Sequence, residues 1–232
     1  MKKTAITILL LCALVFTMTG AAFAPSEEET AEIFGEAFGT IEDDGYVNEY
    51  FGLGFAPPEE WTFYTEEELA EMMNLTIAVM EDEDLRETMR EFMEDGSSVT
   101  NMAARKGIGT QNLNMRLMKN ENGMLMMYSE EYILKQIVAT VEDQLTAAGY
   151  EDLELEIREI RFAGESKPAL FITGAFYNIP VYQAEILLMG EEYYAIVTFT
   201  SLQEDQLEEQ FEYWYVLDAE EDAPEEAEKE SA

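Results

Sequence analysis

Residues 169–200 read ALFITGAFYNIPVYQAEILLMGEEYYAIVTFT. Three runs of apolar, aromatic and β-branched residues alternate here with two short turn-forming segments, Asn178-Ile179-Pro180 and Gly190-Glu191-Glu192. Short hydrophobic runs that are bounded by such segments are typical of consecutive antiparallel strands. The stretch therefore predicts a three-stranded β-meander over 169–177, 181–189 and 193–200.

The segment before the meander predicts a helix followed by a strand. Ser129 is placed as an N-cap, a stripe of apolar residues follows at helical spacing, and Gly149 ends the pattern. The stripe consists of Ile133, Ile137, Val138, Val141 and Leu145. Apolar and acidic residues then alternate over 153–157, which indicates a strand with one buried face. The apolar residues resume out of phase at Ile160, and a bulge or a twist would explain the change.

The elements farther from the meander complete the expected order. Residues 45–64 predict two aromatic-rich strands joined by glycine and proline turns. Thr65 and Glu68 form a capping-box pair ahead of helical patterns that run to about 80 and over 85–96. Strands are expected over 99–106 and 113–119, and a last helix over 204–217. This order predicts an α+β fold in which a mostly antiparallel sheet is flanked by helices.

The N-terminus carries the features of a cleavable export signal. Lys2 and Lys3 precede an apolar run over 5–16, which is shorter than the roughly 20 residues of a membrane-spanning helix. Ala21 stands where a lipoprotein signal would have cysteine. We expect a signal peptide over 1–24, a linker or short helix over 25–44, one domain over 45–217 and an acidic disordered tail over 218–232. The protein is then secreted or extracytoplasmic and bacterial, without a stable membrane anchor after cleavage; an uncleaved anchor is the alternative.

Composition excludes several chemistries. The chain has no histidine, and its one cysteine, Cys12, lies in the signal, so histidine-dependent and cysteine-dependent catalysis and histidine-ligated zinc are excluded. The 50 acidic residues against 13 Lys and Arg give a formal charge of −37. Such a charge repels nucleic-acid phosphates and favours a cationic partner. Acidity that only keeps a secreted chain soluble is the alternative.

The element order resembles that of the PsbP-like superfamily of secreted and lipid-anchored proteins. The opening strand pair of that family is similar to residues 50–61, YFGLGFAPPEEW, and its terminal meander and helix to residues 169–217. The chain is also similar to uncharacterised secreted proteins of anaerobic Gram-positive bacteria. The resemblance implies an α/β/α sandwich and a binding or accessory role without a catalytic constellation. It transfers no site residue.

Candidate sites in the sequence are few. Trp61 could contact a ligand, although a strand position beside Phe63 favours core packing. A group of methionines, Met115, Met118, Met124, Met126 and Met127, could form an adaptable groove or a copper(I) site, against the simpler alternative of core filling.

Carboxylates are the other candidates. Weak Ca²⁺ binding is possible at 42–44, at Asp82 and Asp84, or over 218–230, but none of these matches an EF-hand loop. No other cofactor is expected. The sequence predicts a secreted non-enzymatic accessory or binding protein. The alternatives are a carboxylate-based glycan hydrolase, which needs two carboxylates converging in a cleft, and a calcium-responsive extracellular protein.

Overall fold

The structure is a computed structural model that describes residues 34–42, 45–65, 68 and 98–217. The expected signal peptide, the acidic tail and most of the two helical patterns over 65–96 lie outside the described residues. At the start of those patterns the expected capping pair is in place. The Thr65 backbone N–H donates to Glu68 Oε2 at 3.0 Å, and the Glu68 N–H donates to Thr65 Oγ1 at 3.3 Å.

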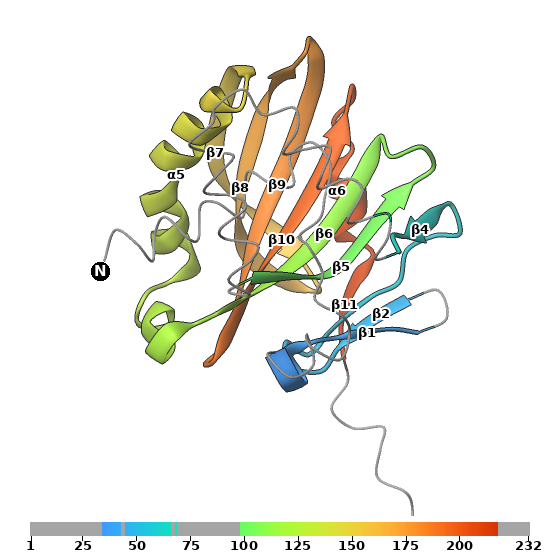
Figure 1. Ribbon diagram of the computed structural model, residues 1–232, viewed down its shortest axis with the longest axis vertical. Coiled ribbons are helices and arrows are strands. Elements are labelled where there is room, and N and C mark those ends of the chain that lie inside the picture. Colours follow the sequence, from blue (N-terminus) through green and yellow to red (C-terminus); the bar gives the residue numbers. More distant parts are fainter. Residues whose placement is uncertain (1–33, 43–44, 66–67, 69–97, 218–232) are drawn as a thin grey trace, which may run out of the picture.

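A seven-stranded antiparallel sheet forms the centre of the molecule (Figure 1). Its order is β4 (Trp61–Phe63), β5 (Ser98–Lys106), β6 (Gln111–Lys119), β10 (Tyr193–Leu202), β9 (Ile179–Met189), β8 (Glu165–Phe176) and β7 (Tyr150–Phe162). The predicted meander is confirmed, because β8, β9 and β10 are consecutive and adjacent. The strands expected over 99–106 and 113–119 are confirmed as β5 and β6.

A second, four-stranded sheet covers one face of the first. Its order is β1 (Thr40–Glu42), β2 (Gly45–Asn48), β3 (Leu53–Phe55) and β11 (Trp214–Val216). Tyr46 and Phe55 of this sheet pack with Met115 and Val197 of the large sheet in one hydrophobic core. The Tyr46 hydroxyl also donates to Asn101 Oδ1 on β5. This buried hydrogen bond fixes the two sheets against each other.

The chain enters that core before the expected domain start at 45. A 3-10 helix, η1 (Gly35–Ala37), leads into β1 within the segment expected to be a linker or short helix. Phe34 and Ala37 are fully buried in the core between the sheets. Their burial makes this segment part of the packed structure.

Helix α5 (Glu130–Ala147) covers the opposite face at β7 and β8 (Figure 1). Ser129 is its N-cap, as predicted, because Ser129 Oγ accepts a hydrogen bond from the Tyr132 N–H at 3.2 Å. Its buried side chains make a second core with the large sheet, and they are Ile133, Leu134, Ile137, Val141 and Leu145. The predicted helix is therefore confirmed. A 3-10 helix, η2 (Glu121–Met127), connects β6 to it.

The predicted α+β fold with helices flanking the sheet is wrong. The described residues are predominantly antiparallel strands in two sheets, and the face opposite α5 is covered by strands β1, β2, β3 and β11. Part of this wrong prediction comes from the C-terminal end of the domain, where a long helix was expected. The helix expected over 204–217 is only α6 (Leu207–Phe211), after which Trp214 and Val216 pair with Phe55 and Leu53 of β3.

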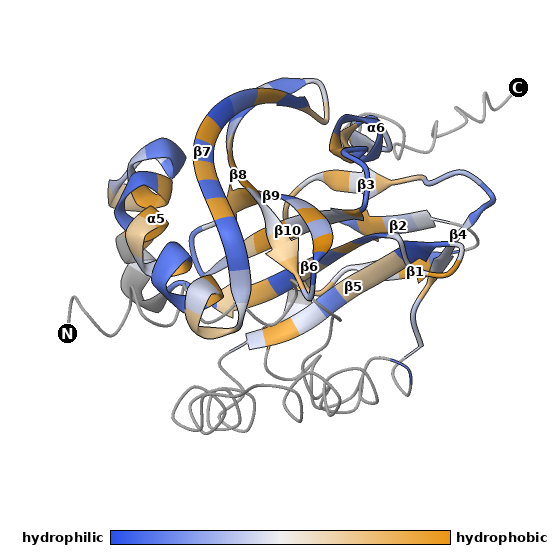
Figure 2. Cartoon of the chain, turned by 90° about the horizontal axis from the view of Figure 1, so that it is seen from above, coloured by the Kyte–Doolittle hydropathy of each residue, from blue (hydrophilic) through white to orange (hydrophobic). Residues whose placement is uncertain are grey.

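The structure of β7 explains why the apolar residues change phase at Ile160. The register shifts only between Glu151 and Glu154, and pairing with β8 is continuous from Glu154 to Phe162. Leu155 and Ile157 pack into the α5 core, whereas Ile160 and Phe162 pack into the core between the sheets. The change of phase is thus the point at which the strand passes from one core to the other. Figure 2 shows how strongly β7 bends.

Candidate binding cavity between the two sheets

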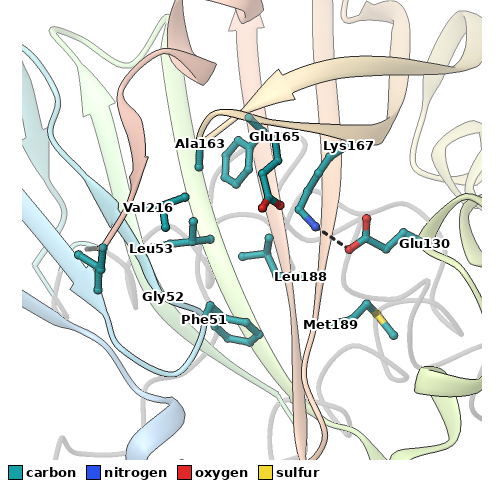
Figure 3. A pocket seen from close by; sticks show the side chains of 12 residues that line it. Phe51, Gly52, Leu53, Glu130, Ala163, Glu165, Lys167, Leu188, Met189 and Val216 are labelled. Carbon is teal, nitrogen blue, oxygen red and sulfur yellow. Dashed lines mark hydrogen bonds and ion pairs between the residues drawn. The ribbon is translucent and has the colours of Figure 1, made fainter. Parts of the chain in front are cut away.

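A cavity of about 260 Å³ lies where one end of the large sheet meets the small sheet (Figure 3). Five segments line it: the β2–β3 turn, β11, the β7–β8 turn with the start of β8, the end of β9 and the start of α5. The pairing of β8 with β9 ends at Ala169 and Ile186. Lys167 and Leu188, two residues beyond that last pair on each strand, both line the cavity. The cavity therefore depends on the whole fold.

An ion pair forms one wall of the cavity. Lys167 Nζ lies 2.8 Å from Glu130 Oε1, and both side chains are about four-fifths buried, at 22% and 19% exposure. Glu130 occupies the first position of α5, where a carboxylate interacts favourably with the positive end of the helix dipole. The pair joins the start of the helix to the sheet and holds the ammonium group at the edge of the cavity.

Glu165 is a second carboxylate in the same cavity. The β7–β8 hairpin turns at Ala163 and Gly164, whose φ values are 47° and 81°, so that Glu165 is the first residue of β8 and pairs with Phe162. Its carboxylate points into the cavity (Figure 3) and makes no hydrogen bond or ion pair with any other residue that the structure describes. Two carboxylates and one ammonium leave the cavity with one unit of negative charge.

The remaining walls are mostly apolar. Leu53 and Val216 are paired across β3 and β11, and Leu188 is buried at 3% exposure on the sheet face beneath them. Phe51 and Met189 complete the rim (Figure 3). A small number of charged groups on an apolar surface is the usual composition of a small-molecule site. The cavity can thus hold a small ligand that has an apolar part and a positive charge.

Trp61 does not line this cavity. It is 6% exposed, and its ring makes edge contacts with Phe55 and Tyr213 at centroid distances of 6.3 and 5.9 Å. These rings belong to the core between the two sheets. Trp61 therefore lies where core packing would put it, and a ligand contact through it is not part of the candidate site.

The methionines of the sequence are separated by the structure. Met115 and Met118 are both buried, but they project from opposite faces of β6 into different cores. Met126 and Met127 are exposed on η2, and nothing is described of the Met124 side chain. The buried pair fills the cores, and the five residues form no common groove in the described part of the chain.

The acidic segments considered for Ca²⁺ are almost entirely outside the described residues. Glu42 is exposed at the end of β1, and 43–44, Asp82, Asp84 and 218–230 are not described. Among the residues that are described, no group of three or more acidic, histidine or cysteine side chains is placed to hold a metal ion. Weak Ca²⁺ binding stays a prediction.

Sequence reasoning did not find Glu130, Glu165 or Lys167. They belong to a helix start and to the beginning of a strand, and no motif spacing links these positions. Proximity to the hairpin turn at Ala163 and Gly164 does not single out Lys167 among the 13 basic residues, because Arg161 lies as close to the same turn.

Comparison with known proteins finds no family model and no curated protein that matches this chain. Within the described residues, no helix is long and apolar enough to cross a membrane.

Proposed function

We propose that this chain is a secreted, non-enzymatic bacterial binding protein whose ligand is a small organic amine with an apolar group. The observation that carries the proposal is the Glu165 carboxylate, which points into the cavity and has no partner among the described residues, while the neighbouring Lys167 is neutralised by Glu130. A ligand ammonium would pair with Glu165, and its alkyl or aryl part would contact Leu53, Leu188 and Val216.

Size and charge support the same ligand class. A cavity of about 260 Å³ is slightly smaller than the roughly 300–1,000 Å³ that is usual for drug-sized ligands, which favours a compact molecule. The formal charge of −37 attracts cations to the whole surface and adds to the negative charge of the cavity. A cationic ligand in this cavity would agree with the cationic partner that composition favours.

Titration calorimetry with alkylammonium ions of increasing length tests this proposal. Each methylene that enters the cavity should strengthen binding by about 0.8 kcal/mol, roughly fourfold in Kd, until the cavity is full. The alcohol of the same length should bind more weakly, because it lacks the charge that pairs with Glu165.

Two glutamine variants provide the comparison. Glu165→Gln should lose the preference for the amine over the matched alcohol, a loss of roughly fivefold for a partly exposed ion pair. Glu154→Gln removes the same charge from an exposed position of β7 and should retain the preference. Equal binding of amines and alcohols to the unmodified chain would contradict the proposal.

A carboxylate-based glycan hydrolase is the second candidate, because Glu130 and Glu165 line the same cavity. The apolar wall and the ion pair of Glu130 with Lys167 disfavour it, since a general acid must hold a proton and sugar hydroxyls need polar partners. Incubation with aryl glycosides should release no phenol. Turnover that disappears in Glu165→Gln would replace the binding proposal with this one. The PsbP-like resemblance stays a prediction.

A further inference from the structure

Polar side chains form a row on the α5 face of the large sheet, away from the cavity. Thr198 of β10 is paired with Asn114 of β6 on one side and with Glu185 of β9 on the other. These three side chains project from the same face because directly paired residues share a face in an antiparallel sheet. Their further neighbours in the row, Ala103 and Leu170, belong to the α5 core.

The next row along the strands is polar as well. Two residues farther on, Thr200 pairs with Gln183, and Gln183 Nε2 donates to Thr200 Oγ1 at 3.0 Å. Gln183 lies on the same face as Glu185, since the two are separated by one residue of the same strand. The central strands thus place a carboxyl, two amides and two hydroxyls together inside the protein.

These groups are buried and have unused hydrogen-bonding capacity. Asn114 is 1% exposed, Gln183 0% and Glu185 2%. Glu185 Oε1, Gln183 Oε1 and both amide atoms of Asn114 have no hydrogen-bond partner among the residues that the structure describes. An unsatisfied buried polar atom costs about 1–3 kcal/mol, and native proteins leave few of them. Three neighbouring side chains in this state favour a bound species, either a water molecule or an ion.

The chemistry of the open atoms selects the species. Three of the four are oxygens, from one carboxyl and two amides, and oxygen is the ligand that hard cations prefer. Arg116 is a buried basic residue on the same face of β6, and its Nη2 donates to Ser98 Oγ at 2.9 Å, on the side of β6 remote from β9. One carboxylate balances one positive charge, and a buried site favours neutrality.

We propose that Asn114, Gln183 and Glu185 bind one hard monovalent metal cation, Na⁺ or K⁺, over Thr198 in the interior of the protein. Neighbouring strands are about 4.8 Å apart, so the backbones of Asn114 and Glu185 stand roughly 10 Å apart on either side of β10. Side chains of this length can reach towards each other across Thr198, and an ion would fill the space between their oxygens. This site is separate from the candidate binding cavity at Glu165, because Leu188 of that cavity projects from the opposite face of β9.

Thermal unfolding in different chloride salts at equal ionic strength tests the site. All salts are compared in the Glu165→Gln background, so that an organic ammonium ion cannot pair with that carboxylate. Choline chloride provides the baseline, because choline screens charge but is too large for a site made of three side chains. NaCl or KCl should raise Tm above that baseline, and at a cation concentration about ten times Kd the unfolding equilibrium constant should fall about tenfold. An equal Tm in choline, Na⁺ and K⁺ would overturn the proposal. So would a larger rise with CaCl₂ than with either monovalent salt, since the site would then be divalent.

Glu185→Gln locates the effect, because it keeps the shape of the side chain and removes the balancing charge. This variant should lose the difference between the metal chlorides and choline. Glu154→Gln, on the exposed face of β7, should keep it. If Glu185→Gln retains the full difference, the cation binds elsewhere and the assignment fails. The salt comparison with Glu185 in place stands by itself even if Glu185→Gln is poorly folded.

Discussion

Glu185 is an ionisable residue that lies in the interior of the protein, at 2% exposure. Burial raises its pKa to about 7, because the interior disfavours the charged carboxylate. Sequence reasoning could not anticipate this. Gln183 and Glu185 alternate with Ala184 and Ile186, a pattern that normally indicates a solvent-facing side of a strand. Only the matching polar positions on the next two strands of the sheet, Thr198 of β10 and Asn114 of β6, distinguish a buried polar row from a solvent-exposed face.

The raised pKa predicts how stability depends on pH in a choline buffer without metal cations. Between about pH 4.5 and 7 the unfolded chain loses the Glu185 proton while the folded protein retains it. The folded state then binds more protons, so its stability falls as the pH rises through this window, by about 3 kcal/mol for a shift of this size. Urea unfolding of the unmodified chain and of Glu185→Gln, repeated across the window, isolates this contribution from that of the other carboxylates.

The unfolding free energy of the unmodified chain minus that of Glu185→Gln should fall as the pH rises from about 4.5 to 7 and should level off outside this range. Glu154→Gln, compared in the same way, should show no such change, because that side chain is exposed. Parallel curves for the unmodified chain and Glu185→Gln would show that Glu185 titrates normally.

Helix α5 shows what local sequence determines at the scale of an element. Its N-cap, its apolar stripe and its terminal glycine are all within 21 consecutive residues. The cap and the glycine are where the sequence predicts them, and the stripe differs only in that Leu134 is buried and Val138 is partly buried. Strand β11 shows the opposite. Trp214 follows a helical pattern, and what makes it part of a strand is its pairing with Phe55, near the other end of the domain. Tertiary pairing of this kind overrides local preference.

The candidate cavity, like strand β11, is formed by tertiary packing rather than by local sequence. Glu130 begins a helix and Glu165 follows a hairpin turn, and only the packing of α5 on β8 brings them to one cavity. Their roles could not be derived from spacing along the chain.

The N-cap of α5 should matter for both stability and the cavity. Replacing Ser129 with alanine removes the acceptor of the Tyr132 N–H and should lower the free energy of unfolding by about 1 kcal/mol. Fraying of the first turn also displaces Glu130 from Lys167. Urea denaturation gives the stability change as a lower midpoint with an unchanged slope. Ser129→Thr retains a hydroxyl and should lose much less; equal losses in the two variants would exclude capping as the cause.

At the scale of the whole molecule, the charge of −37 is a constant destabilising force. Like charges repel one another more strongly in the compact state than in the expanded one, and salt screens exposed charges over a Debye length of about 10 Å at 0.1 M. We therefore expect the Tm of Glu165→Gln, which lacks the carboxylate for organic ammonium ions, to rise with choline chloride concentration alone, measured by thermal unfolding at neutral pH. A Tm that is constant or falls over this range would mean that the acidic residues are already compensated.

Strand β7 links the two cores of the protein in one piece of chain. Leu155 and Ile157 anchor its first half under α5, and Ile160 and Phe162 anchor its second half beneath the small sheet. Loss of either α5 or the small sheet would expose the apolar side chains of one half of β7. Each layer therefore depends on the other through this strand. The protein should consequently melt as a single cooperative unit, with no partly unfolded form in which one layer survives alone.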